Sequence, residues 1–328
     1  MINVIFCTDG KYVQHLGVAL VSLLSNNPEN QFLITIVTGK RKQSWESGLA
    51  QIAANYGNAS IQFKTFDLRR VAHLRTDHHL TVAVYVRLFL TEFFDDSVSK
   101  VLYLDSDLLV CRDISPLWNT DISGYALAAV RDHPASRCLL EPPIPPERFF
   151  NSGVLLVNLD RWRRSGAPHH LVKFAEEHRS TLLSHDQDVL NGVYTSETCL
   201  LGLEWNFQAR YADYTADELW MEPEEFAGAR DNPGIIHFST KYKPWNYGVQ
   251  VPHQELYFQY LALTPWRGYI PRETLQTKVR RMLRFDEMKQ QIKSRFPETA
   301  RLLRRARYRS RVSPPGRRAR QSASPLDV

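Results

Sequence analysis

Two aspartates two residues apart follow a hydrophobic run in Lys100–Asp107, and this pattern is the strongest indication of chemistry in the chain. Val101–Leu104 predicts a strand, and in extended backbone residues i and i+2 point to the same side. Asp105 and Asp107 are therefore expected to aim at one point beyond the strand. Neighbouring carboxylates repel each other, and a divalent cation that also binds a diphosphate relieves that repulsion. Solvated acids in a loop show the same spacing, so the motif alone leaves both interpretations open.

A second short strand is expected at the hydrophobic run near residue 236, with a histidine at its end and a lysine after it. His237 ends the run, and imidazole is a third ligand that shifts the preference of a carboxylate site from magnesium toward manganese. Lys243 comes six residues later and supplies a compact positive charge suited to phosphate. A lone histidine in a strand more often packs in the core or lies on the surface. The metal interpretation therefore depends on the pairing of His237 with the two acids and with Lys243.

Alternating strand and helix patterns predict the elements that position these residues. The expected strands are Val4–Cys7, Phe32–Val37, Ile61–Phe66, Val101–Leu104, Ala126–Val130 and Val154–Val157. The expected helices are Val13–Leu24, Trp45–Tyr56, His170–Glu177 and Gln187–Gly192. Strand–helix–strand repeats at this spacing predict an α/β fold with a mostly parallel sheet and helices on both faces. Ligands of such sheets bind beyond the carboxyl ends of the strands, which is where the two acids are expected.

Composition excludes several other classes of protein. Of 328 residues, 43% are hydrophobic and 23% are charged, which is enough apolar surface for a sizeable core. No run approaches the ~18 apolar residues of a membrane span. Neither G-x-G-x-x-G nor a P-loop motif occurs, which argues against glycine-cradled dinucleotides. The four cysteines form no C-x-x-C pair, and the N-terminus has no charged segment before its first apolar run. Both features predict a cytoplasmic protein without a signal peptide.

Basic residues are concentrated near the C-terminus. Residues 278–320 contain 16 Lys and Arg but only 3 Asp and Glu, although the whole chain has a net charge of only +6. We expect a catalytic domain at 1–270, a basic helical segment at 271–312 and a disordered tail at 313–328. Attraction to an anionic membrane surface is the favoured interpretation of the basic segment, because Arg and Lys alternate with Leu, Phe and Tyr. The alternatives are a merely solvated helix face and, less favoured, nucleic-acid binding.

Seven motifs in a fixed order resemble glycosyltransferase family 8, the bacterial lipopolysaccharide galactosyl- and glucosyltransferases. They are Phe6–Tyr12, Tyr85–Leu88, Val101–Asp107 with Pro116–Trp118, Phe150–Leu159, Asp186–Gly192, Trp205–Phe207 and His237–Trp245. Each motif is moderately specific, and their common order makes chance agreement very improbable. The resemblance implies a GT-A type fold, a UDP-sugar donor and retention of the anomeric configuration. It also implies a manganese ion as cofactor, with magnesium as the alternative.

The resemblance also implies roles for individual residues. Asp105, Asp107 and His237 are the implied metal ligands. Implied contacts to the nucleotide and the donor sugar are Cys7, Thr8, Asp9, Tyr12, Arg87, Ser106, Asp132, Asn151, Ser152 and Lys243, together with Asp105. Tyr12 is the implied stacking partner of uracil. Gln187 and Asp186 are the implied catalytic pair beside the reacting carbon. Without the family, a helix N-terminus is the favoured interpretation of Asp186 and its neighbours, a turn that of Asn151 and the core that of Tyr12.

Three functions therefore compete. The leading hypothesis is a retaining hexosyltransferase that moves galactose or glucose from a UDP-sugar to a saccharide acceptor. In this hypothesis the acceptor is lipid-linked, such as a lipopolysaccharide, and the enzyme is peripheral on the inner leaflet of the plasma membrane. A nucleotide-sugar pyrophosphorylase is the second candidate, although no glycine-rich loop follows the first strand. A non-enzymatic protein that binds membranes or nucleic acids through its basic tail is the third.

Overall fold

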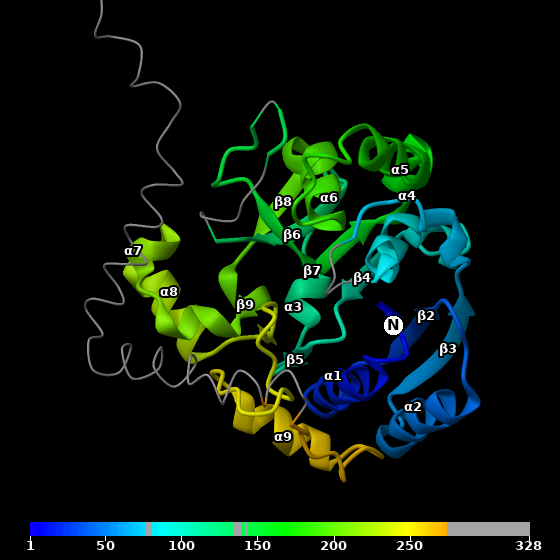
Figure 1. Cartoon of the computed structure of the whole chain (residues 1–328), viewed down its shortest axis with the longest axis vertical. Coiled ribbons are helices and arrows are strands. Elements are labelled where there is room, and N and C mark those ends of the chain that lie inside the picture. Colours follow the sequence, from blue (N-terminus) through cyan, green and yellow to red (C-terminus); the bar gives the residue numbers. More distant parts are fainter. Residues whose placement is uncertain (77–80, 134–138, 142, 274–277, 279–328) are drawn as a thin grey trace, which may run out of the picture. The chain divides into compact units, whose positions relative to one another are not determined.

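A seven-stranded sheet forms the centre of the computed structural model, which describes residues 1–76, 81–133, 139–141, 143–273 and 278 (Figure 1). Met1–Arg272 form one unit and Glu273–Val328 form another, and the sheet belongs to the first. Its strands are β1 (Ile2–Thr8), β2 (Phe32–Thr38), β3 (Ala59–Thr65), β4 (Lys100–Leu104), β6 (Leu127–Arg131), β7 (Phe150–Asn158) and β8 (Thr198–Leu201). All six predicted strands are present, with ends that differ by a few residues.

One strand of the sheet runs against the others. The strand order is β3-β2-β1-β4-β7-β6-β8, and β7 is antiparallel to both β4 and β6, whereas the other neighbours are parallel. The predicted mostly parallel α/β sheet is confirmed. Because β7 is reversed, its first residues lie beside the carboxyl end of β4. The backbone N–H of Asp105 donates to the carbonyl of Gly153 there (2.8 Å).

Helices and 3₁₀ segments connect the strands. The α-helices are α1 (Val13–Ser25), α2 (Gln43–Tyr56), α3 (Ser115–Trp118), α4 (Leu159–Ser165), α5 (Ala167–Glu177), α6 (Asp186–Tyr194), α7 (Ala216–Leu219), α8 (Pro223–Asp231) and α9 (Gln254–Ala262). The 3₁₀ segments are η1 (Leu68–Val71), η2 (Val82–Phe93), η3 (Thr195–Glu197), η4 (Leu203–Asn206) and η5 (Ala209–Asp213). The four predicted helices correspond to α1, α2, α5 and α6 and are confirmed.

The central strands of the sheet are buried on both faces, as expected for parallel strands covered by helices. Val4 and Phe6 of β1 pack with residues of α1 and α2, whereas Ile5 packs with residues of η2, α4 and α5. In β4, Leu104 faces the first of these clusters and Tyr103 faces the second. This alternation places the hydroxyl end of Tyr103 on the same side of the sheet as η2.

A second, three-stranded sheet brings distant segments to the end of β4. Its order is β5-β10-β9, formed by Leu108–Val110, Ile235–His237 and Phe207–Gln208. Antiparallel pairing sets His237 opposite Leu108, and the N–H of Phe238 donates to the carbonyl of Asp107 (2.9 Å). This register places the end of β10 directly beside the two aspartates, although about 130 residues separate them in the sequence.

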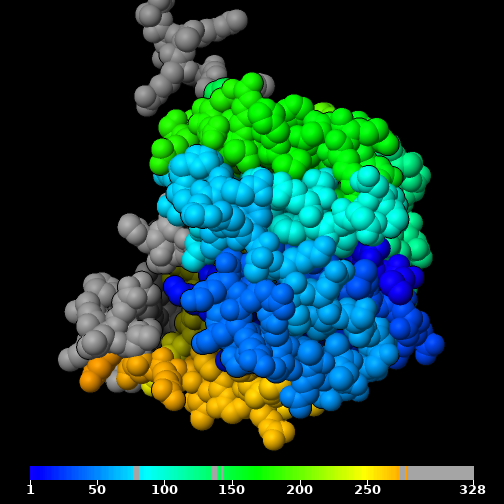
Figure 2. All heavy atoms as spheres, turned by 90° about the vertical axis from the view of Figure 1, so that its right-hand side faces the viewer, coloured from blue at the N-terminus to red at the C-terminus, as the bar shows by residue number. Residues whose placement is uncertain are grey.

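A tryptophan from the C-terminal part of this unit fills a gap between α1 and α2. A methyl group built on Gly17 of α1 would lie 2.5 Å from the ring of Trp266, and one on Gly48 of α2 would lie 3.0 Å from it. Figure 2 shows this C-terminal region, in orange, directly against the blue N-terminal elements. The two glycines therefore provide the space into which the indole packs.

The predicted basic segment and disordered tail lie outside the described residues, apart from residues 271–273 and 278. Within the described part of the chain, none of the helices combines the length and the apolar character needed to cross a bilayer.

Candidate active site

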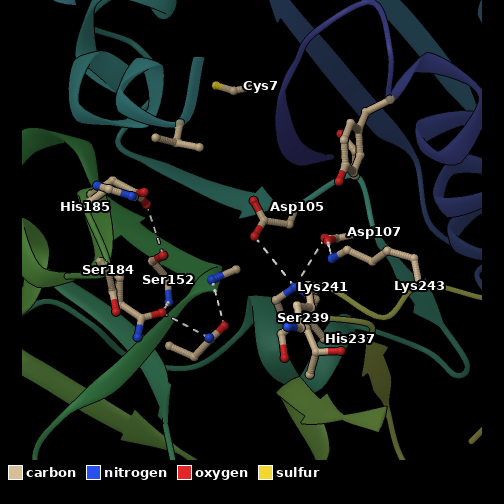
Figure 3. Close-up of a pocket in the computed structure, with 18 of the residues that line it drawn as sticks. Cys7, Asp105, Asp107, Ser152, Ser184, His185, His237, Ser239, Lys241 and Lys243 are labelled. Atoms are coloured by element: carbon tan, nitrogen blue, oxygen red, sulfur yellow. Dashed lines mark hydrogen bonds and ion pairs between the residues drawn. The ribbon is translucent and has the colours of Figure 1, made fainter. Parts of the chain in front are cut away.

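A cavity of about 740 Å³ opens at the carboxyl ends of β1 and β4 (Figure 3). All fifteen residues singled out from the sequence line this one cavity. The strand topology explains the convergence, because β1, β4 and the reversed start of β7 meet at the same edge. The roles of the individual residues remain predictions, whereas their placement together is a property of the structure.

Asp105, Asp107 and His237 form a compact set of possible metal ligands. One ligand atom of each lies within 4.8 Å of those of the other two. The Nε2 atom of His237 is 3.2 Å from Asp107 Oδ1 and 3.7 Å from Asp105 Oδ2. The assumption of extended backbone through the aspartates was wrong, because β4 ends at Leu104 and a turn carries the chain into β5. The turn nevertheless directs both carboxylates at His237. Ser106 lies within it, and its buried hydroxyl has no hydrogen-bond partner among the described residues.

The other oxygen of each carboxylate is occupied by protein groups. Asp105 Oδ1 accepts hydrogen bonds from the Tyr103 hydroxyl (2.7 Å) and from Arg87 Nη2 (2.8 Å). Asp107 Oδ2 forms an ion pair with Lys243 Nζ at 2.5 Å. Burial opposes the charge of Asp107, but Lys243 and His237 together lower the pKa of that carboxyl below its usual value. One oxygen of each aspartate is therefore left facing His237.

Arg87 is held by protein groups on the floor of the cavity. Its guanidinium donates to Asp105, lies 3.1 Å from Asp186 Oδ2 and donates to the carbonyl of Ser152 at 2.8 Å. It also lies 4.5 Å from the centre of the Tyr103 ring. Burial raises the pKa of Asp186, and Arg87 acts against that rise. The contacts that the structure shows for Arg87 thus organise two carboxylates, and the predicted contact with the donor remains untested.

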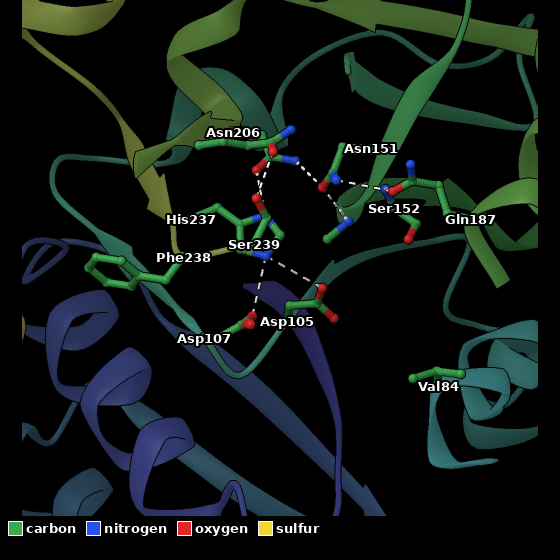
Figure 4. Close-up of polar contacts among 12 residues, drawn as sticks. Val84, Asp105, Asp107, Asn151, Ser152, Gln187, Asn206, His237, Phe238 and Ser239 are labelled. Carbon is green, nitrogen blue, oxygen red and sulfur yellow. Dashed lines mark hydrogen bonds and ion pairs between the residues drawn. The ribbon is translucent and has the colours of Figure 1, made fainter. Parts of the chain in front are cut away.

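Hydrogen bonds fix the amide of Gln187 on the opposite wall of the cavity (Figure 4). Gln187 Oε1 accepts from Asn151 Nδ2 (3.0 Å) and from the backbone N–H of Ser152 (3.1 Å). Its Nε2 donates to Asp132 Oδ2 (2.9 Å). The backbone N–H of Ser152 can only donate, so it determines which end of the Gln187 amide is the oxygen. Asp186 precedes Gln187 at the start of α6, and its carboxylate accepts from the Ser152 hydroxyl (3.1 Å).

Asp132 anchors this wall. Its Oδ1 accepts from Gln208 Nε2 (2.7 Å), Arg210 Nη2 (3.0 Å) and the Tyr211 hydroxyl (3.1 Å). Although burial disfavours the charge, Arg210 and hydrogen bonds from Gln208, the His133 backbone and Gln187 lower the pKa of Asp132 to about 2. A carboxylate so fully bonded to protein acts mainly as the fixed acceptor for Gln187. The predicted sugar or ribose contact of Asp132 stays a prediction.

Cys7, Thr8 and Asp9 lie at the end of β1, on the predicted nucleotide side. Burial raises the pKa of the Cys7 thiol to about 12, so the group is a neutral thiol. Asp9 accepts hydrogen bonds from the N–H of Lys11 (2.9 Å) and from the Thr81 hydroxyl (3.2 Å). These bonds fix the loop that connects β1 to α1.

Tyr12 directly precedes α1 and is held by an aromatic cluster. Its ring meets Trp245 edge-on, with centroids 6.0 Å apart. His15 stacks on Trp245 at 3.6 Å and shares a hydrogen bond with the hydroxyl of Tyr257 (2.7 Å). Burial lowers the pKa of His15 to about 3, so this stack is neutral. Tyr12 thus lines the cavity from a fixed position, as a stacking surface requires.

Five residues that shape the site had no individual role in the predictions from the sequence, although three of them lie in the quoted motifs. They are Tyr103, Gly153, Asn206, Gln208 and Arg210. Gly153 had a usable signal, because a glycine inside a strand often marks close approach of another group. A methyl group on Gly153 would lie 2.3 Å from His237 Cε1 and 2.9 Å from Asp105 Oδ2. The absence of a side chain at this position therefore makes room for the ligand set.

Comparison with known proteins identifies the class and then the family. The fold is of the GT-A type and is similar to the crystal structure of the galactosyltransferase LgtC in complex with donor and acceptor sugar analogues. The TM-score is 0.71 at 24% sequence identity, and the match covers 81% of this chain and 99% of the LgtC chain. The Glycosyl transferase family 8 model matches residues 3–248, and the chain belongs to this family. The resemblance drawn from the motifs is thereby confirmed, and glycosyl transfer is the activity class.

Two relatives show how far the similarity extends. General stress protein A of Bacillus subtilis is 30% identical over 272 residues, which are 81% of this chain and 95% of that protein. The crystal structure of the glycosyltransferase GlyE of Streptococcus pneumoniae has a TM-score of 0.60 at 26% identity. That similarity covers 80% of this chain and 60% of GlyE, so the chain spans little more than half of that longer protein.

Proposed function

We propose that the protein is a retaining hexosyltransferase that moves galactose or glucose from a UDP-sugar to a saccharide acceptor. The observation that carries the proposal is the arrangement of a single cavity. A set of cation ligands and Lys243 lie on one side of it, and the fixed amide of Gln187 lies on the other. A diphosphate requires positive charge, and the sugar attached to it requires a polar group at the neighbouring position. The proposal therefore assigns the first side to the diphosphate and the second to the hexose.

Asp105, Asp107 and His237 fit a divalent cation as a set of ligands. Two carboxylate oxygens and one imidazole nitrogen converge, and the mixed set favours manganese over magnesium. When bound, such an ion supplies positive charge against the negative charge that develops on the departing diphosphate. Lys243 contributes to the same stabilisation, because its ammonium group already lies at the edge of the ligand set.

The positions of Gln187 and Asp186 favour attack on the same face as departure. Gln187 Oε1 already accepts two hydrogen bonds, which makes an uncharged amide a still weaker nucleophile. Asp186 is paired with Arg87 and bonded to Ser152, which lowers its nucleophilicity. In the proposed reaction the bond from sugar C1 to the diphosphate oxygen breaks, and its electron pair stays on that oxygen. The acceptor oxygen then bonds to C1 from the same side and passes its proton to the phosphate.

A panel of UDP-sugars tests the function. With Mn²⁺, release of UDP should occur with one hexose donor, and EDTA should stop it. Asp105→Asn should lower the rate by about 100-fold or more, because the neutral amide removes one charged ligand. The measurements are UDP release and the anomeric configuration of the product by NMR. Absence of release with every donor would refute the proposal, and an inverted product would refute retention alone.

We further propose that residues 278–320 attach the enzyme to an anionic inner-leaflet surface, where a lipid-linked saccharide such as lipopolysaccharide is the acceptor. The 16 basic and 3 acidic residues of this segment support the proposal. Deletion of residues 278–328 should abolish sedimentation with phosphatidylserine vesicles but leave UDP-sugar hydrolysis intact, since Met1–Arg272 form their own unit. Neutral phosphatidylcholine vesicles are the control. Unchanged vesicle binding by the shortened chain would exclude the membrane role. If the full chain binds RNA and the shortened chain does not, while vesicle binding is the same for both, the nucleic-acid alternative is favoured.

A further inference from the structure

Asn206 belongs to a sequence motif, Trp205–Phe207, to which the proposed reaction gives no role. It ends η4 immediately before β9 and is buried, with 1% of its surface exposed. Its side chain lies between His237 and Asn151, so it connects the metal side of the cavity to the sugar side (Figure 4). A buried amide in this position must have both of its ends satisfied.

The backbone determines how this amide is oriented. The N–H of Gly153 donates to Asn151 Oδ1 (3.0 Å), and a backbone N–H can only donate. The atom of Asn206 that approaches Asn151 Oδ1 at 2.9 Å must therefore be the NH₂ group. This leaves Asn206 Oδ1 facing His237 Nδ1 at 2.9 Å. A carbonyl oxygen only accepts, so Nδ1 of His237 carries the proton.

In the neutral ring, the other nitrogen of His237 then carries the lone pair. Nε2 faces Asp107 Oδ1 at 3.2 Å and Asp105 Oδ2 at 3.7 Å. When the ring is neutral, three electron-rich atoms face one another: Nε2 of His237, Oδ1 of Asp107 and Oδ2 of Asp105. This arrangement favours a cation among them, and the hydrogen bond at Nδ1 increases the basicity of Nε2.

We infer that Asn206 is a positioning residue, which holds His237 in the Nδ1–H tautomer and so presents Nε2 to the cation. The inference deepens the proposed function and rests on its metal site. The same amide supports the sugar side, because Asn151 receives the Asn206 hydrogen bond at its oxygen and donates from its nitrogen to Gln187 (3.0 Å). Asn206 therefore supports the metal ligand and, through Asn151, the amide proposed to face the sugar.

Two substitutions separate these two contributions. Asn206→Leu preserves size but removes both the acceptor and the donor. Asn206→Asp keeps an acceptor for His237 Nδ1 but removes the donor to Asn151. The control is Asn58→Ala, because Asn58 is another buried asparagine, hydrogen-bonded to the carbonyls of Leu24 and Asn27. Circular dichroism and thermal unfolding verify that each full-length variant is folded.

The main readout is the tautomer of the neutral His237 ring in metal-free protein, obtained from long-range ¹H–¹⁵N NMR at a pH high enough for the ring to be neutral and assigned with His237→Gln. The wild type and Asn206→Asp should show a protonated Nδ1, whereas Asn206→Leu should lose this preference. Calorimetric titration with Mn²⁺ should give affinity 10- to 100-fold weaker for Asn206→Leu, and closer to wild type for Asn206→Asp. Asn206→Asp should instead lower kcat, because the support of Asn151 is lost. If Asn206→Leu fails to fold, Asn206→Asp alone tests the inference. Its Mn²⁺ affinity should stay near that of the wild type, and its kcat should fall.

An unprotonated Nδ1 in the wild type would overturn the inference. It would also be overturned if Asn206→Leu left the tautomer and the Mn²⁺ affinity unchanged, or if Asn58→Ala weakened Mn²⁺ binding to the same extent. Failure of the proposed function has a different signature. In that case the wild type would neither bind Mn²⁺ nor release UDP, whereas the NMR spectrum would still report the tautomer.

Discussion

Gly153→Ala should reduce kcat/KM by about 100-fold or more while the protein remains folded. The new methyl group would lie 2.3 Å from His237 Cε1, whereas carbon atoms in contact are about 3.5–4.0 Å apart, so the ring must move by about 1 Å. A displacement of this size in a catalytic group costs on the order of 100-fold. Gly153 lies in β7 and does not have positive φ, so alanine introduces no backbone strain. The effect should therefore arise from the ligand set alone.

Steady-state UDP release and Mn²⁺ titration measure this effect, and Gly124→Ala is the matched control. A methyl group on Gly124 meets nothing within 4 Å, and its φ is also not positive. Gly124→Ala should retain wild-type activity and metal affinity. If Gly153→Ala retained both as well, then His237 would not be a metal ligand, and the proposed diphosphate side of the cavity would lose its basis.

Gln187→Ala should lower kcat by about 100-fold and change the donor affinity little. The amide of Gln187 is fixed by Asn151, Ser152 and Asp132 before any substrate binds. A dipole fixed in advance stabilises charge that develops in the transition state, and loss of one such group typically costs 10²- to 10³-fold. The charge concerned is the positive charge on the sugar as the C1–O bond breaks. Because the ground-state sugar lacks this charge, binding should depend little on the amide.

Single-turnover rates and calorimetry with the UDP-sugar separate the two parameters. Gln51→Ala, at an exposed position of α2, is the control and should behave as wild type. Weak donor binding with normal turnover in Gln187→Ala would mean that Gln187 only holds the donor. The catalytic assignment would then shift toward Asp186.

The strands and helices of the N-terminal half could be predicted because their hydrophobic pattern is strong. Ile34 and Ile36 of β2 and Leu16 and Leu20 of α1 are all buried, and their spacing gives the period of each element. Of the small sheet, only the short strand that ends at His237 was predicted; its pairing with β5 and β9 could not be, because strands of two or three residues contain no periodicity. The reversal of β7 was also hidden, since a buried strand has the same pattern in either direction.

The ligand set of the site could be proposed from the sequence because Asp105, Asp107 and His237 belong to motifs whose order resembles that of the family, whereas each motif alone left other interpretations open. The supporting residues could not, because their roles depend on neighbours that are distant in the chain. Tyr103 looks like an ordinary strand residue until its hydroxyl is seen on Asp105. Arg87 has a role that the resemblance did not indicate, since it pairs with both Asp105 and Asp186, and its implied contact with the donor stays a prediction.

The indole of Trp266 has a consequence for the order in which the chain can acquire its structure. Chains emerge from the ribosome N-terminus first, and a domain generally folds as a unit. Gly17 and Gly48 lie within the first fifty residues, but the ring that packs against them is made more than two hundred residues later. The packing of α1 and α2 can therefore be completed only when nearly the whole of Met1–Arg272 has been synthesised.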